Sequence, residues 1–232
     1  MFPVHDENPI SITPYVNYTL IGLCVGIFLW QFAAGPDGQQ QIVYRLGVIP
    51  AVLFGHGQLS DAWVPGYVTV FTSMFLHGGW MHLIGNMLYL WVFGNNIEAA
   101  MGHMRFIVFY LLCGVAAVLA QGLPDTDSVI PMVGASGAIS GVLGAYLMLY
   151  PRATVTVVVP IIIILKTFRI PALVVLGFWF GMQLFSVLTT DSGEGGVAFG
   201  AHIGGFVAGV LLIAFFKYRH IPFGIFVWNK SS

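Results

Sequence analysis

Long apolar stretches with almost no charge decide what this chain can fold into. Six of them come close to the length of about 20 residues that a membrane-spanning helix needs. They cover residues 15–34, 80–95, 106–121, 131–150, 171–188 and 197–218. Charged residues make up only 7% of the 232 residues, against about 25% in a soluble domain. We therefore expect an all-α integral membrane protein, folded as a bundle of six transmembrane helices.

The remaining segments divide the chain around this core. Residues 1–14 contain three prolines and two acidic residues, and they predict an irregular N-terminal tail before a six-span core at 15–218. Residues 219–232 would form a C-terminal tail. The apolar run 154–165 is short and broken by a proline, so it favours a core or interfacial segment over a seventh span.

The connection 35–71 is rich in glycine and proline but also apolar. This composition favours partial insertion beside the bundle over a plain linker.

The distribution of basic residues predicts the orientation in the membrane. Seven of the eight Lys and Arg residues lie on the same side of the six-span arrangement as both termini, whereas Arg45 lies on the other side. By the positive-inside rule, both termini are cytoplasmic. We expect a multi-pass protein of a cell membrane, in a prokaryotic inner or plasma membrane. The net charge of −1 lacks the basic excess of a nucleic-acid-binding surface, so no nucleic-acid partner is expected.

Two glycine-rich stretches carry the most informative polar residues. The run 131–150 holds Ser136 and Ser140 among four glycines, each of which weakens a helix by about 1 kcal/mol relative to alanine. In a membrane, close approach of a neighbouring backbone compensates for this loss. The second stretch places His202 ahead of Gly205 and Gly209, which form another small-residue face. The serine helix alone is compatible with buried packing serines, but the two stretches together suggest a nucleophile and its base.

A further polar pair lies in the second span. His82 and Asn86 are four residues apart and share one helical face. Histidines inside spans are functional candidates, although hydrogen bonding between helices remains an equal alternative. In the predicted orientation this pair falls in the outer third of the bilayer together with Ser136 and His202. The other histidines, including His77 in the loop before this span, are expected to be solvated.

A metal site is the rival use for the two span histidines. The sequence contains no HExxH motif and no carboxylate inside a span, so we expect no metal. The same lack of an acid that could orient the histidine favours a Ser–His dyad over a triad.

Four motifs, in this order and spacing, resemble the rhomboid intramembrane serine proteases. They are HGGWMHLIGN from His77, EAAMGHMRF from Glu98, GASG from Gly134 and AHIGG from Ala201. The resemblance covers nearly all of the chain from the first span onward. It implies that Ser136 is the nucleophile and His202 is the general base.

The resemblance also implies roles for other residues. His82, Asn86 and the backbone N–H of Ser136 would form the oxyanion hole, and Gly134 would let its loop approach the substrate. Phe178 and Trp179 would belong to a lateral gate, and residues 191–196 would form a cap loop. The resemblance further implies a structural corner made by Glu98, Gly102 and Arg105.

This sequence departs from the family pattern at two places. Many members carry an aromatic residue one turn after the nucleophile, beneath the histidine, where this chain has Ser140. Some members have a Trp–Arg pair in the first loop, whereas Trp63 has no arginine beside it.

Together these features predict an intramembrane serine endopeptidase. It would cleave transmembrane segments of other proteins near the outer face of the lipid bilayer, without a metal or other cofactor. Two alternatives belong to other classes. A non-catalytic rhomboid-like protein would bind membrane clients, and loss of the serine or histidine would mark it. A transporter would be expected to show internal repeats or broken helices at the midplane.

Overall fold

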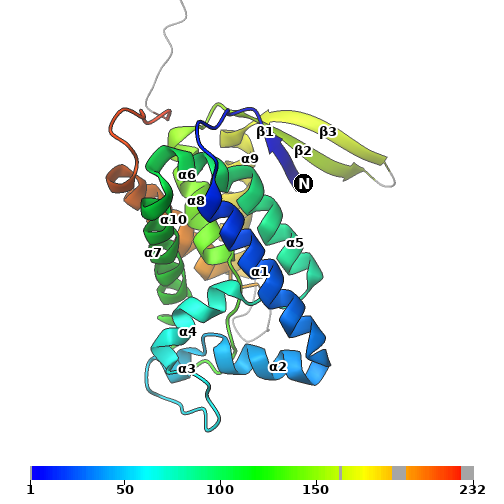
Figure 1. Cartoon of the computed structure of the whole chain (residues 1–232), viewed down its shortest axis with the longest axis vertical. Helices are drawn as coiled ribbons and strands as arrows, with labels where there is room; N and C mark the ends of the chain where they lie inside the picture. Colours follow the sequence, from blue (N-terminus) through cyan, green and yellow to red (C-terminus); the bar gives the residue numbers. More distant parts are fainter. Residues whose placement is uncertain (1, 162–163, 190–196, 226–232) are drawn as a thin grey trace, which may run out of the picture.

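Helix α8, Ser136–Leu149, lies in the middle of the bundle, and every residue from Gly137 to Tyr146 is buried. The computed structural model describes residues 2–161, 164–189 and 197–225. Around α8 stand α5 (Trp80–Tyr89), α7 (His103–Gly122), α9 (Ala172–Thr189) and α10 (Phe199–Phe216), all of which contact it. Helix α1, Tyr15–Ala33, packs against α5 and α7 (Figure 1).

Four of the described helices are long and apolar enough to cross a membrane, namely α1, α7, α9 and α10. Helix α8 is shorter, because it begins only at Ser136, whereas the predicted span began at residue 131. The second predicted span lies in a helical segment that runs through α5, a π-helical turn (Leu90–Gly94) and α6 (Asn95–Met101). The number of six spans therefore stays a prediction.

A small sheet at one end of the bundle shows that the all-α prediction was wrong in this respect. Strand β1 (Phe2–Asp6) pairs with β2 (Thr154–Ile161), which in turn pairs with β3 (Ile164–Pro171), all antiparallel. Alternating Thr and Val in β2 favour an extended chain. The predicted irregular tail at 1–14 is likewise wrong over β1. We call this end of the molecule, at the top of Figure 1, the sheet end.

The opposite end is covered by the connection between α1 and α5, and we call it the loop end (Figure 1). The connection folds into α2 (Gly35–Leu46), α3 (Pro50–Leu53), α4 (Gly66–Thr72) and a 3-10 turn (Ser73–Phe75). It is therefore an ordered structure, although its depth in a membrane stays a prediction.

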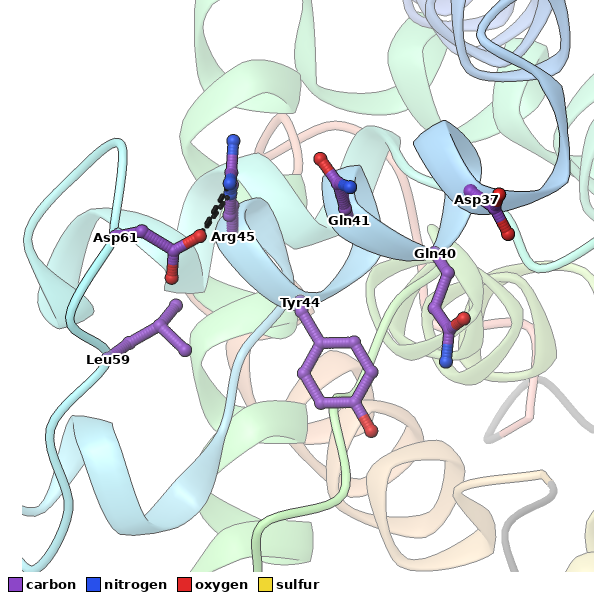
Figure 2. Close-up of a pocket in the computed structure, with 7 residues that line it drawn as sticks. All are labelled: Asp37, Gln40, Gln41, Tyr44, Arg45, Leu59 and Asp61. Atoms are coloured by element: carbon purple, nitrogen blue, oxygen red, sulfur yellow. Dashed lines mark hydrogen bonds and ion pairs between the residues drawn. The ribbon is translucent and has the colours of Figure 1, made fainter.

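The first loop is anchored by an arginine that is distant in sequence from Trp63. The guanidinium of Arg45 on α2 lies over the Trp63 ring, 4.9 Å from its centroid. Its Nε also donates a hydrogen bond of 3.0 Å to Asp61 (Figure 2). Trp63 thus has an arginine partner in space, supplied by the preceding helix. Beside this ion pair, α2 and the loop border an open cavity of about 560 Å³.

The contacts of Glu98, Gly102 and Arg105 agree with the expected structural corner. The buried Glu98 carboxylate accepts the backbone N–H groups of Val16 and Asn17, at 3.0 and 2.7 Å. It therefore caps the first turn of α1, where these N–H groups lack an intrahelical acceptor.

The other two corner residues reach the chain just after α10. Gly102 adopts a φ of 82°, which favours glycine, and a side chain there would also overlap the Tyr218 hydroxyl. The Arg105 guanidinium donates to the Phe216 carbonyl at 3.3 Å and lies over the Tyr218 ring.

Candidate active site

The candidate nucleophile, Ser136, is the first residue of α8. The preceding loop turns at Gly134, whose φ of 129° disfavours any residue with a side chain. The N–H of Gly134 donates to the Ser73 carbonyl at 2.9 Å and fixes this loop. Because the first N–H groups of a helix lack intrahelical acceptors, the N–H of Ser136 is available to a ligand oxygen.

Close contact between two backbones brings the histidine helix to the serine helix. A Cβ on Gly205 would overlap the carbonyl oxygen of Gly137, and one on Gly209 would overlap that of Gly141. Gly144 on α8 is equally confined by the Phe206 carbonyl. The approach predicted from Gly205 and Gly209 is confirmed. It places the histidine helix directly against the helix that begins at Ser136.

The candidate base, His202, is buried, and its ring is held by residues of α9. Its Nδ1 lies 2.7 Å from Oε1 of Gln183. The ring of Trp179 lies beside the imidazole, with centroids 5.8 Å apart. Among the described residues, no hydrogen bond joins the Ser136 hydroxyl to His202, so the dyad is not closed in this structure. Gln183 was missed in the sequence, although it is the one amide in the apolar run 171–188.

The two candidate oxyanion donors lie on α5, and His82 faces the serine loop. A Cβ placed on Gly134 would be 2.8 Å from both Cε1 and Nε2 of His82 and 3.5 Å from Oγ of Ser136. The His82 ring and the serine hydroxyl therefore meet at the same small space beside Gly134. Asn86, one turn further along α5, is buried, and its Nδ2 has no partner among the described residues.

The backbone of the loop before α5 sets the proton position on His82. The N–H of Gly78 donates to Nδ1 of His82 at 3.3 Å, so the neutral ring carries its proton on Nε2. Nε2 is also one of the two ring atoms of His82 that lie 2.8 Å from the Cβ position of Gly134. His82 can therefore donate a hydrogen bond into the space beside the serine.

The aromatic ring that this chain lacks at position 140 is supplied by another helix. Ser140 is buried and donates its hydroxyl to the Ser136 carbonyl at 2.6 Å, so it does not reach the histidine. Trp179, which the resemblance assigns to a lateral gate, also contacts the His202 ring. The neighbouring Phe178 is exposed on the outside of α9. The gate itself stays a prediction, and the predicted cap loop 191–196 lies outside the described residues.

The prediction that His77 is solvated was wrong. Its side chain is fully buried, and its ring forms an edge contact with that of His82, with centroids 5.2 Å apart. Its backbone N–H and carbonyl bond to the side-chain amide of Gln31, at 3.1 and 3.3 Å. These two hydrogen bonds connect α1 to the loop that precedes the candidate oxyanion donors.

Comparison with known proteins covers most of the chain. Residues 65–219 match the family model described as the rhomboid domain. The chain is 31% identical over 193 residues to Rhomboid protein 1, mitochondrial, of Saccharomyces cerevisiae, which is 74% of this chain and 52% of that protein. It is 26% identical over 242 residues to Rhomboid protease AarA of Providencia stuartii, covering 93% of this chain and 80% of that protein.

A third relative is matched over a smaller part of its length. The chain is 31% identical over 134 residues to Rhomboid protease GluP of Bacillus subtilis, which is 58% of this chain and 24% of that protein. The matched part thus spans about half of the yeast protein's length and less of GluP's.

Proposed function

Because this chain belongs to the rhomboid family of membrane proteins, we propose that it is an intramembrane serine endopeptidase with Ser136 as nucleophile and His202 as base. Its substrates would be transmembrane segments of other proteins, cut within reach of the loop end. The observation that carries this proposal is the meeting of the Ser136 hydroxyl and the His82 ring beside Gly134. Serine proteases need this combination of a hydroxyl and a donor for the developing oxyanion.

The proposed reaction begins with attack of Ser136 Oγ on the carbonyl carbon of the scissile peptide bond. His202 accepts the serine proton on Nε2, and the carbonyl oxygen becomes an oxyanion. Nε2–H of His82, the amide of Asn86 and the N–H of Ser136 would donate to that oxygen. The tetrahedral intermediate collapses, His202 returns the proton to the leaving amine, and water hydrolyses the acyl-enzyme by the same steps.

The orientation that we propose follows from the charges at the two ends. Six basic residues lie in or beside elements at the sheet end, namely Arg105, Arg152, Lys166, Arg169, Lys217 and Arg219. Arg45 lies at the loop end. The positive-inside rule then assigns the sheet end and both termini to the cytoplasm. The loop end, with Ser136, would face the outer water that hydrolysis requires. In this arrangement α8 and the α5–α6 segment would be the two further spans.

A second candidate function is client binding without catalysis. It is favoured by one observation, the lack of a hydrogen bond between Ser136 and His202 among the described residues. In proteins without substrate, catalytic hydrogen bonds are often long and tighten only in the complex. The missing hydrogen bond is therefore compatible with both functions, and a cleavage test has to separate them.

The test uses the purified full chain in liposomes with a panel of single-span substrates. We expect cleavage by the wild type and none by Ser136→Ala or His202→Ala, with all three proteins equally folded. A fluorophosphonate probe should label the wild type and Ser140→Ala but leave Ser136→Ala unlabelled. Labelling of Ser136→Ala would refute the assignment of the nucleophile. A folded wild type that neither cleaves nor is labelled would favour client binding.

A further inference from the structure

Gln183 is buried in α9 and bonds to the one ring that the proposed reaction uses as a base. Its Oε1 lies 2.7 Å from Nδ1 of His202, and its Nε2 donates to the Trp179 carbonyl at 3.3 Å. Both ends of the amide are therefore occupied, and its orientation is fixed by the bond to Trp179. The oxygen, not the nitrogen, faces the histidine.

This orientation decides where the histidine carries its proton. An amide oxygen only accepts hydrogen bonds, so the short contact requires a hydrogen on Nδ1 of His202. In the neutral ring, Nε2 then keeps its lone pair. Only this tautomer can take a proton from a serine hydroxyl through Nε2.

We infer that Gln183 is a positioning residue that holds His202 in the tautomer and orientation a general base needs. This inference rests on the proposed function, because it assigns a role within the same site. In a soluble triad a carboxylate takes this place. An amide performs the orienting part of that role without a charge, and a charge inside a membrane helix is costly. The inference therefore accounts for a serine protease site whose helices α8, α9 and α10 contain no Asp or Glu.

The packing of α9 on α10 keeps the amide in reach. Phe180 stacks on Phe206 with ring centroids 4.3 Å apart, and Trp179 lies beside both Phe206 and His202. These contacts lie on the same face of α9 as Gln183. Aromatic packing therefore sets the position of the amide. The hydrogen bond to His202 then determines which ring nitrogen carries the proton.

The first experiment measures the tautomer directly and does not depend on activity. The full chain is labelled with ¹⁵N-histidine, and the ring signals of His202 are assigned by comparison with His202→Gln. At a pH where the ring is neutral, we expect a protonated Nδ1 and an unprotonated Nε2 in the wild type. In Gln183→Met, which keeps the size but removes the acceptor, we expect the tautomers to mix. A wild-type ring protonated on Nε2 would overturn the inference, whether or not the protein cleaves substrates.

The second experiment measures cleavage by the same variants. Loss of a partner that orients a metal-bound histidine typically costs about 10–100-fold in metal affinity or activity. By analogy, we expect a fall in kcat of this order for Gln183→Met with an unchanged KM. Gln183→Glu, unlike Gln183→Met, keeps an acceptor. Its kcat should therefore rise toward the wild-type value as the new carboxylate ionises, which would change the pH profile of kcat. Met182→Leu, at the exposed neighbouring position of α9, is the matched control.

The outcomes separate this inference from the proposed function. A Gln183→Met protein with the kcat of Met182→Leu and an unchanged tautomer would overturn the role of Gln183 while leaving the protease intact. If Gln183→Met does not fold, the wild-type ring signals and the pH profile of Gln183→Glu still decide. A wild-type protein that cleaves no substrate would refute the proposed protease function. The ring signals of His202 would still test its hydrogen bond to Gln183.

Discussion

The two ends of helix α8 treat their polar groups in opposite ways. At the loop end, the Ser136 hydroxyl and Nδ2 of Asn86 make no hydrogen bonds among the described residues. At the sheet end, the Tyr146 hydroxyl and the Asn96 amide both donate to Oδ2 of Asp6, at 2.6 and 2.8 Å. A buried donor without a partner costs about 1–3 kcal/mol. The hydrogen bonds to Asp6 therefore contribute to stability, whereas Ser136 and Asn86 keep donors unpaired, as an oxyanion site requires.

Breaking the contact between α8 and α10 should have the largest effect, because both ends depend on it. Gly205→Val puts a branched side chain where the Gly137 carbonyl lies. Overpacking typically costs about 1–3 kcal/mol, and here a backbone would have to move. We expect loss of cleavage and a clearly lower Tm in detergent. The matched control is Gly177→Val on α9, where, apart from the adjacent residues and the helix's own backbone, no described atom lies within 4 Å of the added Cβ. An equal Tm for both variants would contradict this packing.

Asn86→Ala should affect the loop end alone. Removing one oxyanion donor typically lowers kcat by about 10²–10³-fold, and we expect this loss with little change in KM. The Tm should not fall, because Nδ2 of Asn86 has no partner among the described residues. Asn96→Ala is the counterpart at the sheet end, and there we expect a lower Tm with an unchanged kcat. A pure KM effect for Asn86→Ala would assign that residue to substrate binding.

At the sheet end, Asp6 should make stability depend on pH. Burial raises the pKa of Asp6 above its ordinary value of 3.8, despite the hydrogen bonds from Tyr146 and Asn96. The folded state then keeps a proton that the unfolded chain has lost, so this contribution to stability decreases as the pH rises through the folded pKa. We expect the Tm to rise as the pH is lowered toward this range. Asp6→Asn, which keeps an accepting oxygen, should flatten that slope without changing kcat.

Ser140→Ala should have the smallest effect of the four changes. The Ser140 hydroxyl bonds back to the carbonyl of Ser136 within α8, and such local bonds add little stability to a helix. We expect substantial cleavage and a free energy of unfolding within about 1 kcal/mol of that of the wild type. Loss of most of the activity, measured beside the cleavage rate of the wild type, would show that the hydroxyl supports the reaction.

The parts of the molecule that the sequence predicted well are those with a local signal. Four apolar runs became α1, α7, α9 and α10 with nearly the expected ends. Glycine spacing predicted the contact between α8 and α10, because a missing side chain is visible in the sequence itself. The roles of Ser136, His202, His82 and Asn86 remain proposals. The structure places these residues on α8, α10 and α5, and both α5 and α10 contact α8.

The parts that it missed depend on partners far along the chain. The run from Thr154 is compatible with a strand or a buried segment by periodicity alone, and its neighbour β1 lies at the other end of the sequence. Gln183 is recognised only when the rotation of α9 against α10 is known. Arg45 reaches Trp63 through the fold of the first loop, so their pairing has no signature in adjacent residues.

The π-helical turn Leu90–Gly94 lies between two parts of one continuous helical segment that have different roles. Before the turn, His82 faces the serine loop, and after it Glu98 caps α1. A π-turn accommodates an extra residue, and each residue of an α-helix rotates the chain by about 100°. The extra residue in the turn therefore sets the rotation of the Glu98 side of the segment relative to the His82 side. In a regular α-helix the two side chains would point in other relative directions. Deleting one residue inside it would leave His82 in place and swing Glu98 away from α1, uncoupling the chemistry of this helix from its anchorage.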